Sequence, residues 1–527
     1  MALLLLVIAE RAWVTEDAYI SFRSVDNFVN GYGLRWNVDE RVQAFTHPLW
    51  VLLHIPFYWL TREVFFTTIA ISLVTSLAAF RIGMGAPRHP LLVLVLLVPL
   101  VSSKAFTEYA TSGLETPATL LFLALFARAF LDRDRGASLG RLAFLAALGA
   151  TNRLDCILFY LPALAFAARR DPGPRRLRQL ALGLLPLVAW EAFSLFYYGF
   201  LFPNTKYAKL DTGLPRGGYL RQGFVYALDL LMNDPVSAGA ILIGAALALR
   251  SWRRASQPAL LAAGLALYAA YVVWAGGDFM SGRFWSPCVF LGALLAYDAV
   301  RRECSGLGTA GWATVLLLIG LLPLLHPPSL FFRTRANKFG TLVMDEREYY
   351  ADTNTLLNYS TARRAIHHAF SQEGLRIRKL ARSGSAAGKP TTWITALVGM
   401  FGFHAGPEVI VIDRIGLGDP LLARLPLEDL SKFPRPGHFI RGVPEGYEEA
   451  RRSGSLAGMD PSLAAYYAPL REIVSGPLLS PHRLATIVAF NLGRYDHFRD
   501  AYVASRPARA EAEPKPGGDG AGDAKPR

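Results

Sequence analysis

The first polar cluster that could do chemistry follows the first apolar stretch and contains two adjacent carboxylates, Glu16 and Asp17. A hydroxyl group is a poor nucleophile at neutral pH, so its transfer reactions need a carboxylate that accepts the proton as the oxygen attacks. Asp17, with Glu16 beside it, is therefore the candidate general base. The alternative is a solvated acidic pair that caps a membrane helix.

Basic side chains occur in this and later polar clusters. A phosphate leaving group needs positive charge to stabilise it, and guanidinium, ammonium and imidazolium groups supply that charge. The candidates for holding such a phosphate are Arg23, His47, Lys206, Lys209 and Arg283.

Further polar residues interrupt the apolar pattern and are candidates for substrate binding. They are Glu115, Arg153, Asp155, Asn204 and Asp278. Ionisable residues within membrane segments are costly and mark function by default. Four of the five also have a structural alternative: Glu115 could cap a helix. Arg153 and Asp155 could form an ion pair between helices, and Asp278 could belong to a tight turn.

Two polar loops near the C-terminal end are candidates for binding an acceptor. Asp413 and Asp419 lie in DRIGLGD, directly after the strand-like Val409–Ile412, where α/β folds place ligand-facing loops. His438 and Arg441 lie in GHFIRGVP. Both segments could equally be ordinary surface loops.

The sequence contains no metal-ligand spacing, no phosphate-binding loop and no nucleophile elbow. Glu16, Asp17 and Asp278 could bind a divalent cation without a readable spacing, so the cofactor stays unknown.

Membrane helices must position these residues, because the apolar residues are bunched into long runs of Leu, Ala, Val and Phe. A spanning helix needs about 20 mostly apolar residues, and the runs indicate about eleven crossings. The expected crossings are 1–13, 64–80, 90–103, 117–131, 142–151, 155–168, 179–198, 236–249, 258–275, 285–300 and 311–326. The net charge of +14 does not favour nucleic acid as a partner, because the arginines lie between these runs.

The charge pattern predicts sidedness. Arginines gather in the short loops 81–89, 132–141, 169–178, 250–257 and 301–310, as expected for cytoplasmic loops. The aromatic stretch His47–Leu60 is short for a crossing and is expected to lie at the outer membrane interface. An odd number of crossings then places nearly all the polar clusters outside the cytoplasm.

We therefore expect a polytopic α-helical membrane protein with a soluble C-terminal domain outside the cytoplasm. Residues 1–326 form the membrane domain, in which 14–63 is an extracytoplasmic loop with interfacial helices. Residues 327–505 form an α/β domain, and 506–527 are expected to be disordered because they are rich in Pro, Gly and charge.

The ordered motifs TEDAYISFR, NGYGLRWN, THPLW, SGLETP, PNTKYAK, GGDFMSGRF and DRIGLGDP resemble those of the GT-C superfamily of membrane glycosyltransferases. Within it they are similar to the terminal arabinofuranosyltransferases of mycobacterial cell walls and their proteobacterial relatives. The resemblance implies a protein of the bacterial inner membrane, with an eleven-helix core and with the loop 14–63 and the C-terminal domain in the periplasm. It also implies a polyprenyl-phosphate donor of arabinofuranose or a related pentose, a cell-envelope glycan acceptor, and a base at Asp17. Relatives often have two Asp at this place, so the resemblance leaves the choice between Glu16 and Asp17 open.

A second hypothesis is a non-catalytic membrane protein that regulates an envelope machine such as the flagellar motor. It predicts that no lipid-linked sugar is consumed and that changes at Asp17 are tolerated. A transporter is disfavoured, because the polar residues gather on one face and not at the bilayer midplane of two repeated halves.

Overall fold

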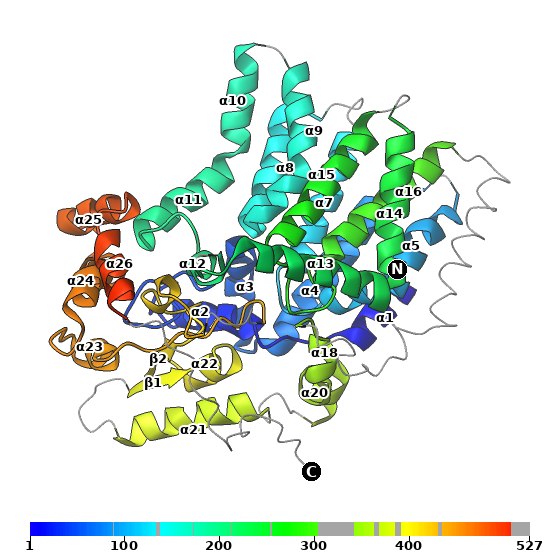
Figure 1. Ribbon diagram of the computed structural model, residues 1–527. Helices are drawn as coiled ribbons and strands as arrows, with labels where there is room; N and C mark the ends of the chain where they lie inside the picture. The colour runs from blue at the N-terminus through cyan, green and yellow to red at the C-terminus, as the bar shows by residue number, and fades with distance from the viewer. Residues whose placement is uncertain are drawn as a thin grey trace.

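The computed structural model of the chain describes residues 1–87, 89–132, 137–171, 173–210, 212–252, 256–303, 342–362, 368–384, 391–429 and 435–506. These residues are mostly helical, with one pair of short strands (Figure 1).

Every expected crossing before residue 301 coincides with helical structure. The helices are α1 (Ala2–Arg11), α4 (Phe65–Met84), α5 (Leu92–Ser102), α7 (Thr116–Leu131), α8 (Leu139–Asn152), α9 (Ile157–Arg170), α10 (Pro174–Gly183), α11 (Leu185–Tyr197), α14 (Pro235–Arg250), α15 (Ser256–Trp274) and α16 (Ser286–Glu303). Most share one apolar core, which runs from Leu4 to Val343 along the sequence. The expected crossing 311–326 lies outside the described residues.

Length and composition support a membrane location for part of this bundle. Among the described residues, α4 and α15 are long and apolar enough to cross a bilayer by themselves. Two bent pairs pass the same test when each is taken together: α10 with α11, bent by 54°, and α13 (Arg216–Asn233) with α14, bent by 104°. The count of eleven crossings therefore stays a prediction.

Glycines allow some of these helices to approach closely. A Cβ atom on Gly244 of α14 would come within 2.0 Å of the Gly292 carbonyl of α16, and one on Gly264 of α15 within 2.1 Å of the Phe159 carbonyl of α9. Small residues at such contacts are typical of membrane helices, whose association depends on close packing.

The segments between the expected crossings also form helices. These are α2 (Ala18–Val29), α3 (Pro48–Thr61), α6 (Lys104–Tyr109), η2 (Leu154–Cys156) and α12 (Asn204–Leu210). α3 matches the aromatic stretch expected at the membrane interface, and Trp59 and Leu60 at its end are exposed. α13 was not expected, because its glycines and charged residues break the apolar pattern.

The C-terminal part is a small α/β unit. Its helices are α18 (Glu346–Tyr349), α19 (Ala351–Asn354), α20 (Leu356–Ala362), α21 (Ala369–Gly384), α22 (Met400–Ala405), η4 (Leu422–Arg424), α23 (Tyr447–Ser453), α24 (Pro461–Ser475), α25 (Pro481–Asn491) and α26 (Asp496–Ser505). Strands β1 (Thr391–Thr395) and β2 (Val409–Asp413) pair in parallel, with Thr391 opposite Val409. β2 is buried along its whole length, which agrees with the apolar run Val409–Ile412 that precedes Asp413.

This unit packs directly on the segment between α1 and α4. Ile20, Trp36 and Ala44 share a core with β2 and α22, and Val42 joins a second core with α24 and α25. Segments far apart in sequence therefore meet beside α2, as Figure 1 shows for α2, α22 and the two strands.

Candidate active site

Asp17 directly precedes α2 in a loop that contacts several distant segments. The Trp13 indole donates to the Glu108 carbonyl at 2.7 Å, and the Thr15 amide donates to the Ser112 carbonyl at 3.0 Å. The Asp17 side chain stays 21% exposed, although most of its neighbours are buried. A carboxylate in this position is held in place and still open to a ligand.

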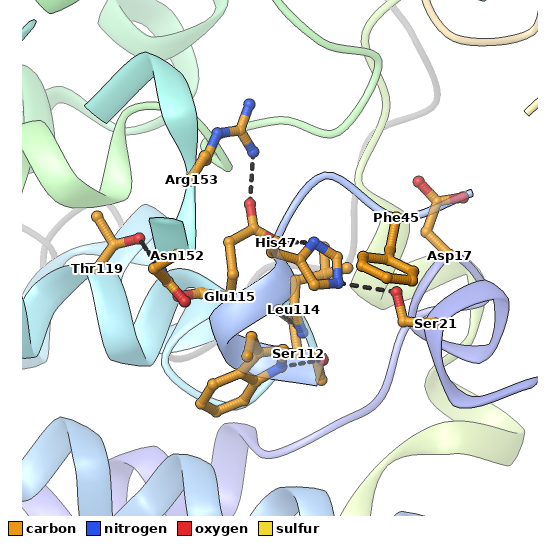
Figure 2. Close-up of polar contacts among 12 residues, drawn as sticks. Asp17, Ser21, Phe45, His47, Ser112, Leu114, Glu115, Thr119, Asn152 and Arg153 are labelled. Atoms are coloured by element: carbon orange, nitrogen blue, oxygen red, sulfur yellow. Dashed lines mark hydrogen bonds and ion pairs between the residues drawn. The ribbon is translucent and has the colours of Figure 1, made fainter. Parts of the chain in front are cut away.

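The centre of the site is Glu115, a buried carboxylate at the start of α7 on which three basic groups converge. Figure 2 shows His47 and Arg153 around it. His47 Nδ1 lies 3.1 Å from Oε2, Arg153 Nη1 hydrogen-bonds Oε1, and Arg283 Nη2 lies 3.7 Å from Oε1. Burial alone would raise the pKa of Glu115, but Arg153, His47 and Arg283 hold it well below its usual range. Glu115 is therefore charged and neutralises part of this basic cluster.

His47 also links Glu115 to α2. Its Nε2 lies 2.8 Å from the Ser21 hydroxyl, while its Nδ1 faces Glu115, as Figure 2 shows. Arg153 is oriented in turn by Asp155, whose Oδ1 accepts from Nε at 2.8 Å. Arg153 and Asp155, which were predicted to bind substrate, thus form the ion pair that was their structural alternative, and this pair extends to Glu115.

Arg283 brings the loop before α16 to Asp17. Its Nη1 lies 3.8 Å from Asp17 Oδ2 and donates to Asp278 Oδ2 at 3.1 Å. Asp278 lies in a loop that begins with Gly276 and Gly277, both at positive φ, where glycine is favoured. One guanidinium therefore contacts Asp17, the expected base, together with Asp278 and Glu115, which were expected to bind substrate.

Further basic residues come from α12, which carries Lys209, and from the C-terminal loop that contains Arg435 and His438. The position of a Cβ on Gly437 is 3.4 Å from Lys209 Nζ, and the neighbouring His438 packs edge-on against Phe279 with ring centroids 4.6 Å apart. Burial and the charge of Arg435 lower the pKa of His438, while Asp17 opposes them. His438 is therefore neutral and can donate or accept a hydrogen bond.

Glu346 and Arg435 belong to this region but were missed by the sequence reasoning. Glu346 Oε1 lies within 3.4 Å of the Thr15 hydroxyl, and Oε2 lies 3.5 Å from Arg435 Nη2. Burial, and then the charge of Asp17, raises the pKa of Glu346 well above its usual range. The acidic segment DERE, residues 345–348, is the signal that could have indicated Glu346.

Glu16 has a different environment from Asp17. Its Oε1 accepts the backbone N–H groups of Gly399 at 2.6 Å and Met400 at 3.0 Å, at the start of α22. Burial, followed by repulsion from Asp17, raises the pKa of Glu16 to about 8 and outweighs those two hydrogen bonds. Glu16 is thus protonated, and its side chain caps the start of α22. It therefore links the loop before α2 to the C-terminal unit.

The raised pKa of Glu16 gives a testable pH dependence. The folded protein holds this proton more tightly than the unfolded chain, so the stabilisation is complete below the usual value of 4.5 and is lost as pH rises through about 8. We expect a Glu16→Gln variant, which keeps the acceptor oxygen, to lose less thermal stability than the parent across this range. Parallel falls in the melting temperatures of both proteins would contradict the assignment.

Arg23 lies apart from the site. Its guanidinium donates to the carbonyls of Trp36 at 2.6 Å and Val409 at 2.8 Å, and also to that of Gly402. It is buried and joins α2 to the C-terminal unit, so its geometry does not support a contact with a phosphate.

The other candidates outside the cluster make contacts that stabilise the fold. Asn204 donates to the Gly416 and Asp419 carbonyls, and Arg441, fully buried, donates to four backbone carbonyls. Asp413 accepts the amides of its own loop, while Asp419 accepts those of Leu421 and Leu422. Lys206 lies over the Tyr207 ring at 4.8 Å. Of the four residues expected to bind the acceptor, only His438 is beside Asp17.

Within the described ranges, no group of three or more His, Cys, Asp and Glu side chains is arranged to hold a metal ion.

Comparison with known proteins identifies two relatives. The chain is 28% identical over 529 aligned residues to the terminal β-(1→2)-arabinofuranosyltransferase of Mycobacterium tuberculosis, covering 81% of each chain. It is 26% identical over 514 residues to the enzyme of the same name from Corynebacterium glutamicum, covering 79% of this chain and 71% of that one. The chain is a relative of these arabinofuranosyltransferases. No family model and no solved structure matches it.

The resemblance inferred from the motifs is thus confirmed over most of the chain. The motif residues Asp17, His47, Glu115 and Arg283, which are widely separated in sequence, form one connected site.

Proposed function

We propose that this chain is a glycosyltransferase that moves arabinofuranose or a related pentose from a polyprenyl-phosphate donor to a cell-envelope glycan on the extracytoplasmic face. The observation that carries the proposal is the partly exposed Asp17 carboxylate, held 3.8 Å from the Arg283 guanidinium. An acid–base group beside a fixed cation suits transfer of a sugar from a phosphate to a hydroxyl. The similarity to arabinofuranosyltransferases supports the choice of sugar.

In the proposed reaction, the acceptor hydroxyl oxygen attacks the anomeric carbon of the donor sugar. Asp17 accepts the proton of that hydroxyl, and the bond from the anomeric carbon to the phosphate oxygen breaks. Polyprenyl phosphate leaves with the bonding electrons. Asp17 is preferred to Glu16 as the base because Glu16 carries its proton at neutral pH and is tied to Gly399 and Met400.

The leaving phosphate is assigned to Arg283 and Lys209. Arg283 is already oriented by Asp278 and Glu115, so it stabilises developing negative charge without rearrangement. In the described part of the chain, the Lys209 ammonium makes no ion pair, so its charge is available to a ligand. Neutral His438, beside Lys209, would hydrogen-bond the sugar or the acceptor.

The experiment is a transfer assay with the full chain in liposomes, using polyprenyl-phosphate arabinofuranose and an arabinan oligosaccharide. Mass spectrometry should find an acceptor heavier by one pentose and an equal amount of released polyprenyl phosphate. Failure to consume any polyprenyl-phosphate pentose, with normal envelope glycans in a deletion strain, would favour the regulatory hypothesis instead.

A matched pair of arginine substitutions separates phosphate binding from structural support. Arg283→Lys should raise the donor KM about tenfold, because a hydrogen bond to a charged group contributes about 1.5–3 kcal/mol. Arg23→Lys should lower the melting temperature and leave the donor KM unchanged, because Arg23 is buried and hydrogen-bonds backbone carbonyls and the Asn37 side chain in the interior. A larger KM effect from Arg23→Lys than from Arg283→Lys would refute this assignment.

A further inference from the structure

The outer face of α25 exposes large apolar side chains. Leu484, Val488 and Leu492 follow one another at intervals of four residues and are 39%, 59% and 81% exposed. Leu479, in the turn before the helix, is 77% exposed. Residues four apart lie on one side of a helix, so these side chains form a continuous apolar stripe.

No side chain of the stripe is charged. The only Asp, Glu, Lys or Arg within α25 is Arg483, which is completely buried. The other exposed side chains of this helix are those of Pro481, His482, Ala485 and Asn491. A soluble protein rarely exposes such a face, whereas a contiguous apolar patch indicates a binding surface.

Hydrogen bonds fix α25 to the end of α11. The Arg483 guanidinium donates to the carbonyls of Phe196 and Tyr197, both at 2.9 Å. The Asn491 side chain donates to the Gly199 carbonyl at 2.8 Å. Figure 1 shows α25 beside the end of α11 that lies farther from α10.

The exposed side of α11 is also apolar and leads to the same place. Leu185, Val188, Phe193 and Phe196 are exposed along this helix, which with α10 forms one of the bent pairs long and apolar enough to span a membrane. By the charge pattern, the chain leaves this crossing on the outer side of the membrane. The α25 stripe therefore continues the lipid-facing side of α11 at the outer interface.

We propose that α25 and the preceding turn, residues 476–480, insert their apolar stripe into the outer leaflet and seat the C-terminal unit on the membrane. Helices with one apolar face lie in the interface in this way, with that face below the headgroups. The contact would keep His438 and its loop at a fixed depth relative to the membrane. The proposal depends on the membrane location and not on the sugar transfer, so either can fail alone.

The test uses the full chain in phosphatidylcholine vesicles, with the native cysteines replaced and single cysteines introduced for an environment-sensitive fluorophore. The two sites are Val488→Cys on the stripe and Leu380→Cys on α21. Leu380 is a matched control, because it is an apolar residue with 51% exposure on a helix far from α11 in Figure 1. Each labelled protein must melt at the temperature of the parent.

We expect lipids that carry a quencher in their acyl chains to quench the probe at residue 488 several-fold more than the probe at 380. Iodide in the water should show the reverse order. Equal access of iodide to both probes would overturn the proposal. The probe at 488 could also be protected from iodide only when a vesicle holds more than one chain. That result would assign the stripe to a contact with a second copy, and it would also overturn the proposal.

Discussion

Replacement of Asp17 by Asn should lower the rate of sugar transfer by about 10²–10⁴-fold, the usual contribution of a positioned general base. The asparagine side chain has nearly the same size but cannot accept the proton of the acceptor hydroxyl. Donor binding should change little, because the neutral side chain leaves Arg283 paired with Asp278 and Glu115. Single-turnover rates with saturating donor would measure the loss.

The matched control is Glu16→Gln, the adjacent carboxylate. Its amide oxygen can still accept the Gly399 and Met400 amides, and the substitution resembles the protonated state of Glu16. We expect nearly full activity at neutral pH. If Glu16→Gln lost activity as severely as Asp17→Asn while retaining the parental melting temperature, the assignment of the base to Asp17 would be wrong.

Glu115→Gln should have the largest effect on stability. The substitution removes the negative charge that faces His47, Arg153 and Arg283 at a position only 2% exposed. Breaking a buried ion pair by removing one partner typically costs about 3–5 kcal/mol, because the other charge stays buried and uncompensated. The melting temperature in detergent should therefore fall sharply.

The contribution of Glu115 to the stability of the fold depends on pH. The pKa of Glu115 is lower in the folded protein than its ordinary value of 4.5, so the stabilisation is present above that value and is lost as pH falls through the folded-state pKa. Glu449→Gln is the control, because Glu449 pairs with Arg452 on the surface and exposed pairs contribute little. Equal melting temperatures for the two variants would show that the Glu115 cluster does not stabilise the fold.

The helices could be predicted from local pattern, because an apolar run of sufficient length forms a helix wherever water is excluded. Every expected crossing before residue 301 is helical, and the aromatic stretch 47–60 is α3. α13 could not be predicted in this way, because its glycines and charged residues have no apolar period. Gly223 of α13 is explained by packing against α15, because a Cβ at this position would come within 1.9 Å of the Val273 carbonyl.

The sequence by itself determined which kinds of residue the site contains. Carboxylates and cations that interrupt apolar membrane segments are energetically costly, so their presence indicates a function. Only the tertiary structure decided their roles. Glu16 and Asp17 are adjacent and chemically alike, yet Glu16 contacts the amide of Gly399, which is 383 residues away, whereas Asp17 faces Arg283. Arg23 and Arg283 are equally basic, but one is enclosed by backbone carbonyls and the other by carboxylates. Side-chain chemistry is local, whereas burial, pairing and pKa depend on contacts that form only when the chain folds.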